Sequence, residues 1–213
     1  MPKINVRKPL SLRPQHLPYI KGLFHLLAAI PIIYLISSVL NGSAGGDPVE
    51  YIIHYTGMGA LNTLVAVLLI SPLAKRYKLG VLMQTRRLVG LWVFAYASLH
   101  ITAFLTLDLL LEWQLLLSEI VKRPYILVGA SAYLLLVLLS ITSINHIKRK
   151  MGRRWQTLHN FVYLIAVLAP IHFYWSVKSE IIEPSVYLVI FAGLLLLRVK
   201  LLKLKSLLGL NTQ

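Results

Sequence analysis

Residues 52–87 read IIHYTGMGALNTLVAVLLISPLAKRYKLGVLMQTRR, an apolar block followed by a basic segment. Residues 52–72 contain no Asp, Glu, Lys or Arg. About 20 such residues in an α-helix cross the ~30 Å hydrocarbon layer of a bilayer. Lys75, Arg76 and Arg87 follow it, as is typical of a loop at a membrane face. This stretch therefore predicts a membrane-spanning helix with a basic loop after it.

The same pattern recurs along the chain. Hydrophobic residues make up 57% of the sequence and charged residues 14%, against about 45–50% and about 25% in globular proteins. No alternation of period two is evident, which disfavours a barrel. We therefore expect an all-α, polytopic bundle with a basic tail at 1–18, a membrane domain at 19–201 and a second tail at 202–213. Its six predicted transmembrane helices cover residues 19–40, 52–72, 88–108, 125–145, 157–176 and 184–201.

The charges predict the orientation of the bundle. All but three of the 22 Lys and Arg residues lie up to Lys21, in the second-to-third and fourth-to-fifth loops, or from Arg198 onward. The exceptions, Lys122, Arg123 and Lys178, share the other side with all seven acids. The positive-inside rule then places both termini in the cytoplasm. A net charge of +15 divided among alternate loops is not a nucleic-acid patch.

Histidine is the candidate metal ligand, because the sequence has seven histidines and no cysteine. His100 lies 13 residues after Arg87, and His172 lies 13 residues after His159, so each is roughly 20 Å from the cytoplasmic edge. Two histidines at one depth on facing helices are what a bis-histidine heme requires. His159 marks a second level nearer the cytoplasm. Residues 13 apart on one ideal helix differ by about 140° in direction, although Pro170 could bend it.

The alternative is that these histidines are structural, in a small non-heme transporter or scaffold. For the other four we expect ordinary roles: solvated or interfacial for His16 and His146, and packing or loop contacts for His25 and His54. The loops are short, so we expect the chemistry to lie in the membrane or at its faces.

The chain resembles the MsrQ (YedZ) family of the ferric-reductase-like transmembrane superfamily. The resemblance rests on GDPVEYIIHYTGMGALNTLVAVLLISPLAK, QTRRLVGLWVFAYASLHITAF, KRPYILVGASAYLLLVLLSIT and KMGRRWQTLHNFVYLIAVLAPIHFYWSVK, which cover most of residues 46–178. Members are membrane subunits of the periplasmic methionine sulfoxide reductase system.

The resemblance implies a multi-pass protein of the bacterial inner membrane that binds heme b, one or two per chain, and FMN. It implies electron transfer from quinol or a cytoplasmic flavin reductase to a periplasmic molybdopterin-containing, MsrP-like catalytic subunit. On this reading the chain supplies electrons and is not itself the catalytic subunit. A ferric or metal reductase is the rival within the superfamily, but that usually needs a flavin domain, which this sequence lacks. The family's heme histidines correspond to His100, His159 and His172.

One departure from the superfamily concerns the inner site. Two-heme members usually carry two histidines on each of two helices, but here Arg86 stands 14 residues before His100, within about 40° of the same face. A guanidinium stays protonated and is no ordinary heme ligand. Arg86 and Arg87 could instead bind a heme propionate or a flavin phosphate. The alternative role of both is positive-inside topology.

Overall fold

The computed structural model describes residues 14–177 and 179–207, and these contain helices and no strand. The predicted tails fall largely outside this part, at 1–13 and 208–213. The elements are η1 (Pro14–His16), α1 (Leu17–Leu40), α2 (Pro48–Arg76), η2 (Gly80–Thr85), α3 (Arg86–Ala103), the π-helix η3 (Phe104–Asp108), α4 (Trp113–Lys122), α5 (Tyr125–Ile141), α6 (Asn145–Met151), α7 (Arg153–His159), α8 (Val162–Ser176) and α9 (Ile182–Leu207).

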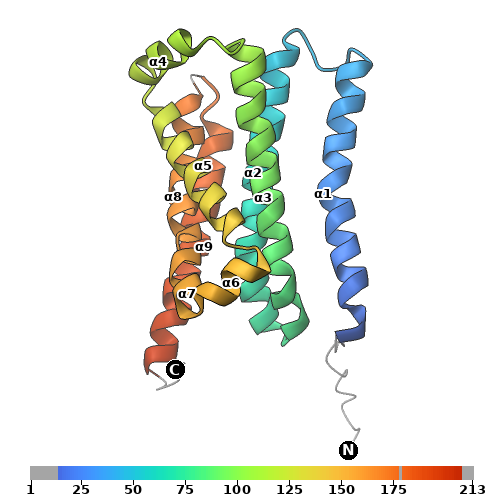
Figure 1. Ribbon diagram of the computed structural model, residues 1–213, viewed down its shortest axis with the longest axis vertical. Helices are drawn as coiled ribbons and strands as arrows, with labels where there is room; N and C mark the ends of the chain where they lie inside the picture. The colour runs from blue at the N-terminus through green and yellow to red at the C-terminus, as the bar shows by residue number, and fades with distance from the viewer. Residues whose placement is uncertain (1–13, 178, 208–213) are drawn as a thin grey trace, which may run out of the picture.

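The membrane bundle predicted from hydropathy is confirmed. Among the described residues, five helical segments are long and apolar enough to cross a bilayer, at 14–40, 48–76, 80–108, 153–176 and 182–199. The pair α4–α5, bent by 111°, makes the sixth. In Figure 1, α4 lies across one end of the bundle while α5 runs down through it. The chain is thus a multi-pass membrane protein.

Capping residues set the start of α2, which hydropathy alone places four residues too late. Asp47 accepts hydrogen bonds from the backbone N–H groups of Val49 and Glu50, each at 3.0 Å. Pro48 occupies the first helical turn, where its missing N–H costs nothing. The Asp47 cap and Pro48 thereby begin the helix at residue 48, in a segment of low hydropathy.

The predicted fourth span, 125–145, is too long, because α5 ends at Ile141. The hydroxyls of Thr142 and Ser143 bond back to the carbonyls of Leu138 and Leu139 at 2.7 and 2.8 Å. Such side chains compete with the helical hydrogen-bond ladder. The chain turns here and begins α6 at Asn145.

The predicted fifth span, 157–176, is interrupted. The helix ends at His159 and resumes at Val162, so the break falls at Asn160 and Phe161 and not at Pro170. The N–H of Phe161 donates to Leu158, three residues back, which is the tighter 3₁₀ pattern. His159 and His172 are therefore on two successive helices, and the 140° angle of a single ideal helix does not apply to them.

Two helix pairs build the centre of the bundle. α2 packs along α3, and α5 packs along α8, with α9 against both α8 and α2. Leu64, Val93, Ile165 and Phe191 are at most 2% exposed and belong to one core cluster. Helix α1 stands at the edge (Figure 1) and leaves many large apolar side chains exposed, as expected for a lipid-facing helix.

Charge divides the two ends of the bundle. The start of α1, η2, α6, α7 and the last turns of α9 lie at one end, here called the basic end (Figure 1). The α1–α2 connection, α4 and the α8–α9 connection lie at the other, here called the acidic end. This arrangement agrees with the loops assigned to each side from sequence. Which membrane face each end meets stays a prediction.

Candidate functional site

A backbone carbonyl of α2 holds the His100 ring in place. His100 lies on α3, half-buried, and its Nδ1 is 2.9 Å from the backbone carbonyl oxygen of Ile53. A carbonyl oxygen only accepts, so Nδ1 carries the hydrogen and Nε2 keeps its lone pair. Gly57 lies one turn further along α2, and a Cβ there would be 3.1 Å from the same Nδ1. The missing side chain lets the imidazole pack closely against α2.

His172 is held in the same way by α5. Its Nδ1 donates to the carbonyl oxygen of Tyr125 at 2.8 Å, again leaving Nε2 with its lone pair. A Cβ on Gly129 would lie 2.7 Å from both Nδ1 and Cε1 of His172, closer than real Cβ contacts come. The position of this ring therefore depends on glycine at 129.

The rings of His100 and His172 lie close together in an edge-to-face arrangement. Their centroids are 6.2 Å apart and their planes are inclined by 83°. Because a metal–imidazole bond is about 2 Å long, two imidazoles on opposite sides of one metal ion have centroids about 6 Å apart. Backbone bonds at Nδ1 fix the tautomer and orientation that metal-ligating histidines usually show. The donor set and its spacing fit a single iron with two axial imidazoles.

No group of three or more His, Asp or Glu side chains that could hold a metal ion occurs in the described residues. Two histidines suffice only for a metal whose remaining ligands come from elsewhere. A porphyrin supplies four nitrogens to its iron and leaves two axial positions. The pair therefore fits heme better than a bare metal ion.

The two half-sites share a spacing that we did not use in predicting them. Each histidine lies 47 residues after the carbonyl that accepts its Nδ1 hydrogen, and in each case glycine lies four residues after that carbonyl. The pairs α2–α3 and α5–α8 thus repeat one arrangement. Gly57, Gly129 and the two carbonyls were missed from sequence, and this repeated spacing is the signal that could have found them.

His159 lies apart from this pair, at the end of α7 near the basic end. Its ring stacks on Trp155 with centroids 3.9 Å apart, and its Nε2 is 3.2 Å from the hydroxyl of Thr142. Lys148 and Arg86 lie close enough to act on it electrostatically. No histidine in the described part of the chain faces it as His172 faces His100.

Arg86 and Arg87 diverge in the structure. The Nε of Arg86 is buried without a hydrogen-bond partner, an arrangement that suits an anionic ligand. Arg87 is exposed and donates to the Oδ1 of Asn145 on α6. Of the two predicted cofactor-binding arginines, the structure brings only Arg86 toward His159.

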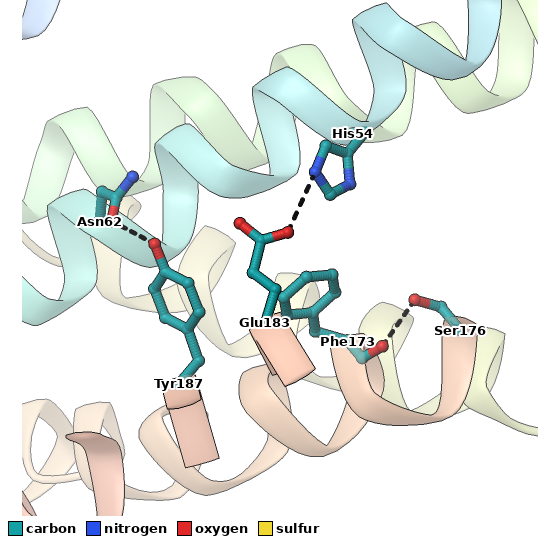
Figure 2. A network of polar contacts seen from close by, with 6 residues as sticks. All are labelled: His54, Asn62, Phe173, Ser176, Glu183 and Tyr187. Carbon is teal, nitrogen blue, oxygen red and sulfur yellow. Dashed lines mark hydrogen bonds and ion pairs between the residues drawn. The ribbon is translucent and has the colours of Figure 1, made fainter. Parts of the chain in front are cut away.

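Two further histidines pair with neighbours outside the site. The Nε2 of His54 lies 3.6 Å from Glu183 at the start of α9, as Figure 2 shows, and both side chains are about half exposed. The Nδ1 of His25 on α1 accepts a hydrogen bond of 3.1 Å from the indole of Trp92. These contacts join α2 to α9 and α1 to α3.

Comparison with protein families agrees with the helical membrane fold. Residues 48–170 match the family described as "Ferric reductase like transmembrane component". The matched region includes His100 and His159 and ends two residues before His172. Fold and match together define the class as ferric-reductase-like transmembrane proteins.

Curated relatives narrow the assignment. The chain is 46% identical over 183 residues to "Protein-methionine-sulfoxide reductase heme-binding subunit MsrQ" of Klebsiella pneumoniae, covering 85% of this chain and 91% of the relative. It is 43% identical over 190 residues to the protein of the same name from Salmonella paratyphi B, with 89% and 96% covered. The chain belongs to the MsrQ family.

Proposed function

We propose that this chain is the heme-binding, electron-transferring membrane subunit of a methionine sulfoxide reductase system in the bacterial inner membrane. The observation that carries the proposal is the pair His100 and His172, with centroids 6.2 Å apart and both Nδ1 atoms occupied by backbone carbonyls. Membership of a family whose curated members are named heme-binding subunits supports it.

His100 and His172 would hold a b-type heme, each through the Nε2 that its Nδ1 bond leaves free. Heme, when bound, supplies one-electron chemistry between ferric and ferrous iron. Both rings lie on helices, and a hydrogen bond from Nδ1 to a backbone carbonyl fixes each of them. Little reorganisation is therefore needed when iron binds. The apolar core around α2, α3, α5 and α8 would exclude water from a bound heme, which is one means by which proteins tune a redox potential.

We assign a second cofactor level to His159 and Arg86. The buried, partnerless Nε of Arg86 supports an anionic group there, either the propionate of a second heme or the phosphate of FMN. A cavity of about 490 Å³ nearby at the basic end, lined by Asn145, Lys148, Arg149 and Gly152, adds cationic side chains that suit a phosphate.

Electrons run, on this proposal, from the basic to the acidic end. The donor is quinol or a cytoplasmic flavin reductase, and the acceptor is a periplasmic molybdopterin-containing catalytic subunit. His100 and His172 lie in the half of the bundle toward the acidic end. That end also carries α4, a short helix lying across the bundle, and would meet the partner.

Reconstitution tests the electron-supply role. We expect vesicles that contain this chain, a physiological donor and the periplasmic subunit to reduce methionine sulfoxide, and vesicles that lack the chain to show only background reduction. The His100→Ala protein should behave like the empty vesicle. His146→Ala serves as the control, since His146 is exposed and outside the site. Equal rates with and without the chain would reject the proposed function.

Substitution of Arg86 tests the inner level separately. We expect Arg86→Gln to lose about tenfold or more in affinity for FMN or a second heme, because a hydrogen bond to a charged group contributes about 1.5–3 kcal/mol. Arg87→Gln is the matched control, since Arg87 is exposed and bonded to Asn145. FMN-to-protein and heme-to-protein ratios after purification report the result. Equal losses in both variants would contradict the assignment.

A further inference from the structure

A cavity of about 420 Å³ lies between α1 and the α2–α3 pair. Its size falls in the range of small-molecule sites, about 300–1,000 Å³. Phe24 and Pro31 line it from α1, Met58 from α2, and Trp92 and Tyr96 from α3. Because its walls are three membrane-spanning helices, a ligand would enter it from the bilayer. An occupant must therefore be lipid-soluble.

Two polar groups on this cavity lack partners. Asn62 lies midway along α2 and its Oδ1 accepts a hydrogen bond of 2.7 Å from the Tyr187 hydroxyl. Figure 2 shows its amide nitrogen turned away from Tyr187. Neither that nitrogen nor the Tyr55 hydroxyl has a hydrogen-bond partner within the described residues. Unpaired polar groups at membrane depth are costly, so these two point to a ligand with hydrogen-bonding oxygens.

Other polar groups on the cavity are already satisfied. The Thr63 hydroxyl donates to Gly59 at 2.7 Å, and the Tyr96 hydroxyl donates to the carbonyl of Ala28 at 2.8 Å. Tyr55 and Asn62 are seven residues apart, so they share one face of α2 about 10 Å apart along its axis. A ligand with one oxygen toward each is an elongated or ring-shaped molecule with polar groups at opposite ends.

The cavity lies against the helices that hold His100. Tyr96 precedes His100 by one turn of α3 and is 2% exposed. Its ring packs onto Gly59, where any Cβ would clash with it. Gly57, which contacts His100, lies on α2 between the cavity residues Tyr55 and Met58. A redox-active ligand here would be separated from the His100 imidazole by about one helical turn.

We propose that this cavity is the quinol site of the chain, with Tyr55 and Asn62 hydrogen-bonded to the two ring oxygens and α1 beside the apolar tail. The proposal rests on the proposed electron-transfer function and adds the place of entry for quinol as the donor, whose electrons would reach the His100–His172 level without passing the His159 level. Oxidation of one quinol to quinone breaks two O–H bonds and releases two protons to water. A heme held by His100 and His172 would take up the quinol's two electrons one at a time and pass them on to the periplasmic subunit.

The test uses the purified heme-loaded chain and a short-chain quinol. We expect Asn62→Leu, which keeps the volume and removes the amide, to slow heme reduction by quinol and weaken quinone binding by about tenfold, the cost of one hydrogen bond. Ala66→Phe, which fills the cavity, should act at least as strongly. Reduction by dithionite and the Soret band should stay unchanged. Ser131→Ala is the control, since Ser131 is exposed on α5 and bonded to its own helix.

Calorimetric titration with the oxidised short-chain quinone measures binding independently of electron transfer. The double variant His100→Ala, His172→Ala should still bind quinone. This distinguishes the cavity from the heme site, because a chain that binds quinone but supplies no electrons to the partner overturns only the proposed function. Quinol reduction and quinone affinity at the unsubstituted level in both Asn62→Leu and Ala66→Phe would overturn the cavity assignment. The cavity assignment would also be overturned if a flavin reductase reduced the heme and quinol did not. It would be overturned as well if phospholipid occupied the cavity and quinone did not displace it.

Discussion

His100→Ala and His172→Ala should each lose the Soret band of the main heme. Removing either ring takes away one of two axial ligands, and the opposite imidazole cannot replace it because its own Nδ1 bond holds it to another helix. Loss of a supporting residue lowers affinity by about 10–100-fold, and loss of a ligand itself should lower it further. We therefore expect heme content after purification to fall to less than about a tenth of the original. Absorption spectra and a heme-to-protein ratio measure this.

The remaining histidines provide the controls for this result. His159→Ala should keep the His100–His172 spectrum, because His159 contacts Trp155 and Thr142 and not this pair. His146→Ala should leave all heme signals unchanged, since His146 is exposed. An unchanged Soret band in both His100→Ala and His172→Ala would reject the heme assignment and favour structural histidines.

Gly129→Ala should displace the His172 ring without removing any atom that could bind iron. The added Cβ would lie 2.7 Å from the ring, so the imidazole must move away from Tyr125 or from iron. We expect heme affinity to fall about 10–100-fold, the usual cost of disturbing the support of a metal ligand. Gly57→Ala should act in the same direction but less strongly, since its Cβ would be 3.1 Å from His100. Heme titration and the low-spin electron paramagnetic resonance signal report both.

Gly90→Ala is the matched control, since Gly90 lies on α3 and a Cβ added there would meet nothing within 4 Å. Alanine favours a helix over glycine by about 1 kcal/mol, so this variant should be slightly more stable. Gly129→Ala should lower heme affinity, whereas Gly90→Ala should leave heme affinity unchanged. Equal heme affinity in Gly129→Ala and Gly90→Ala would show that the close approach of His172 to α5 has no role in binding.

The ends of the helices show where sequence reasoning stops. Hydropathy locates each apolar block, because about 20 apolar residues have few alternatives to spanning a bilayer. Hydropathy does not predict that Asp47 caps α2 or that Thr142 and Ser143 end α5. Hydrogen bonds by polar side chains decide these positions. Hydropathy also missed the break at Asn160, which separates His159 from α8 and where the backbone adopts the tighter 3₁₀ pattern.

Sequence by itself determined the helical membrane bundle, the separation of basic and acidic ends, and the shared depth of His100 and His172. These follow from length, hydropathy and charge, which act locally along the chain. Only the tertiary structure decided which nitrogen of each histidine is free, that Gly57 and Gly129 make room for the rings, and that Arg86 turns toward His159 while Arg87 does not. Those features depend on contacts between helices far apart in sequence, and no local property of either partner specifies them.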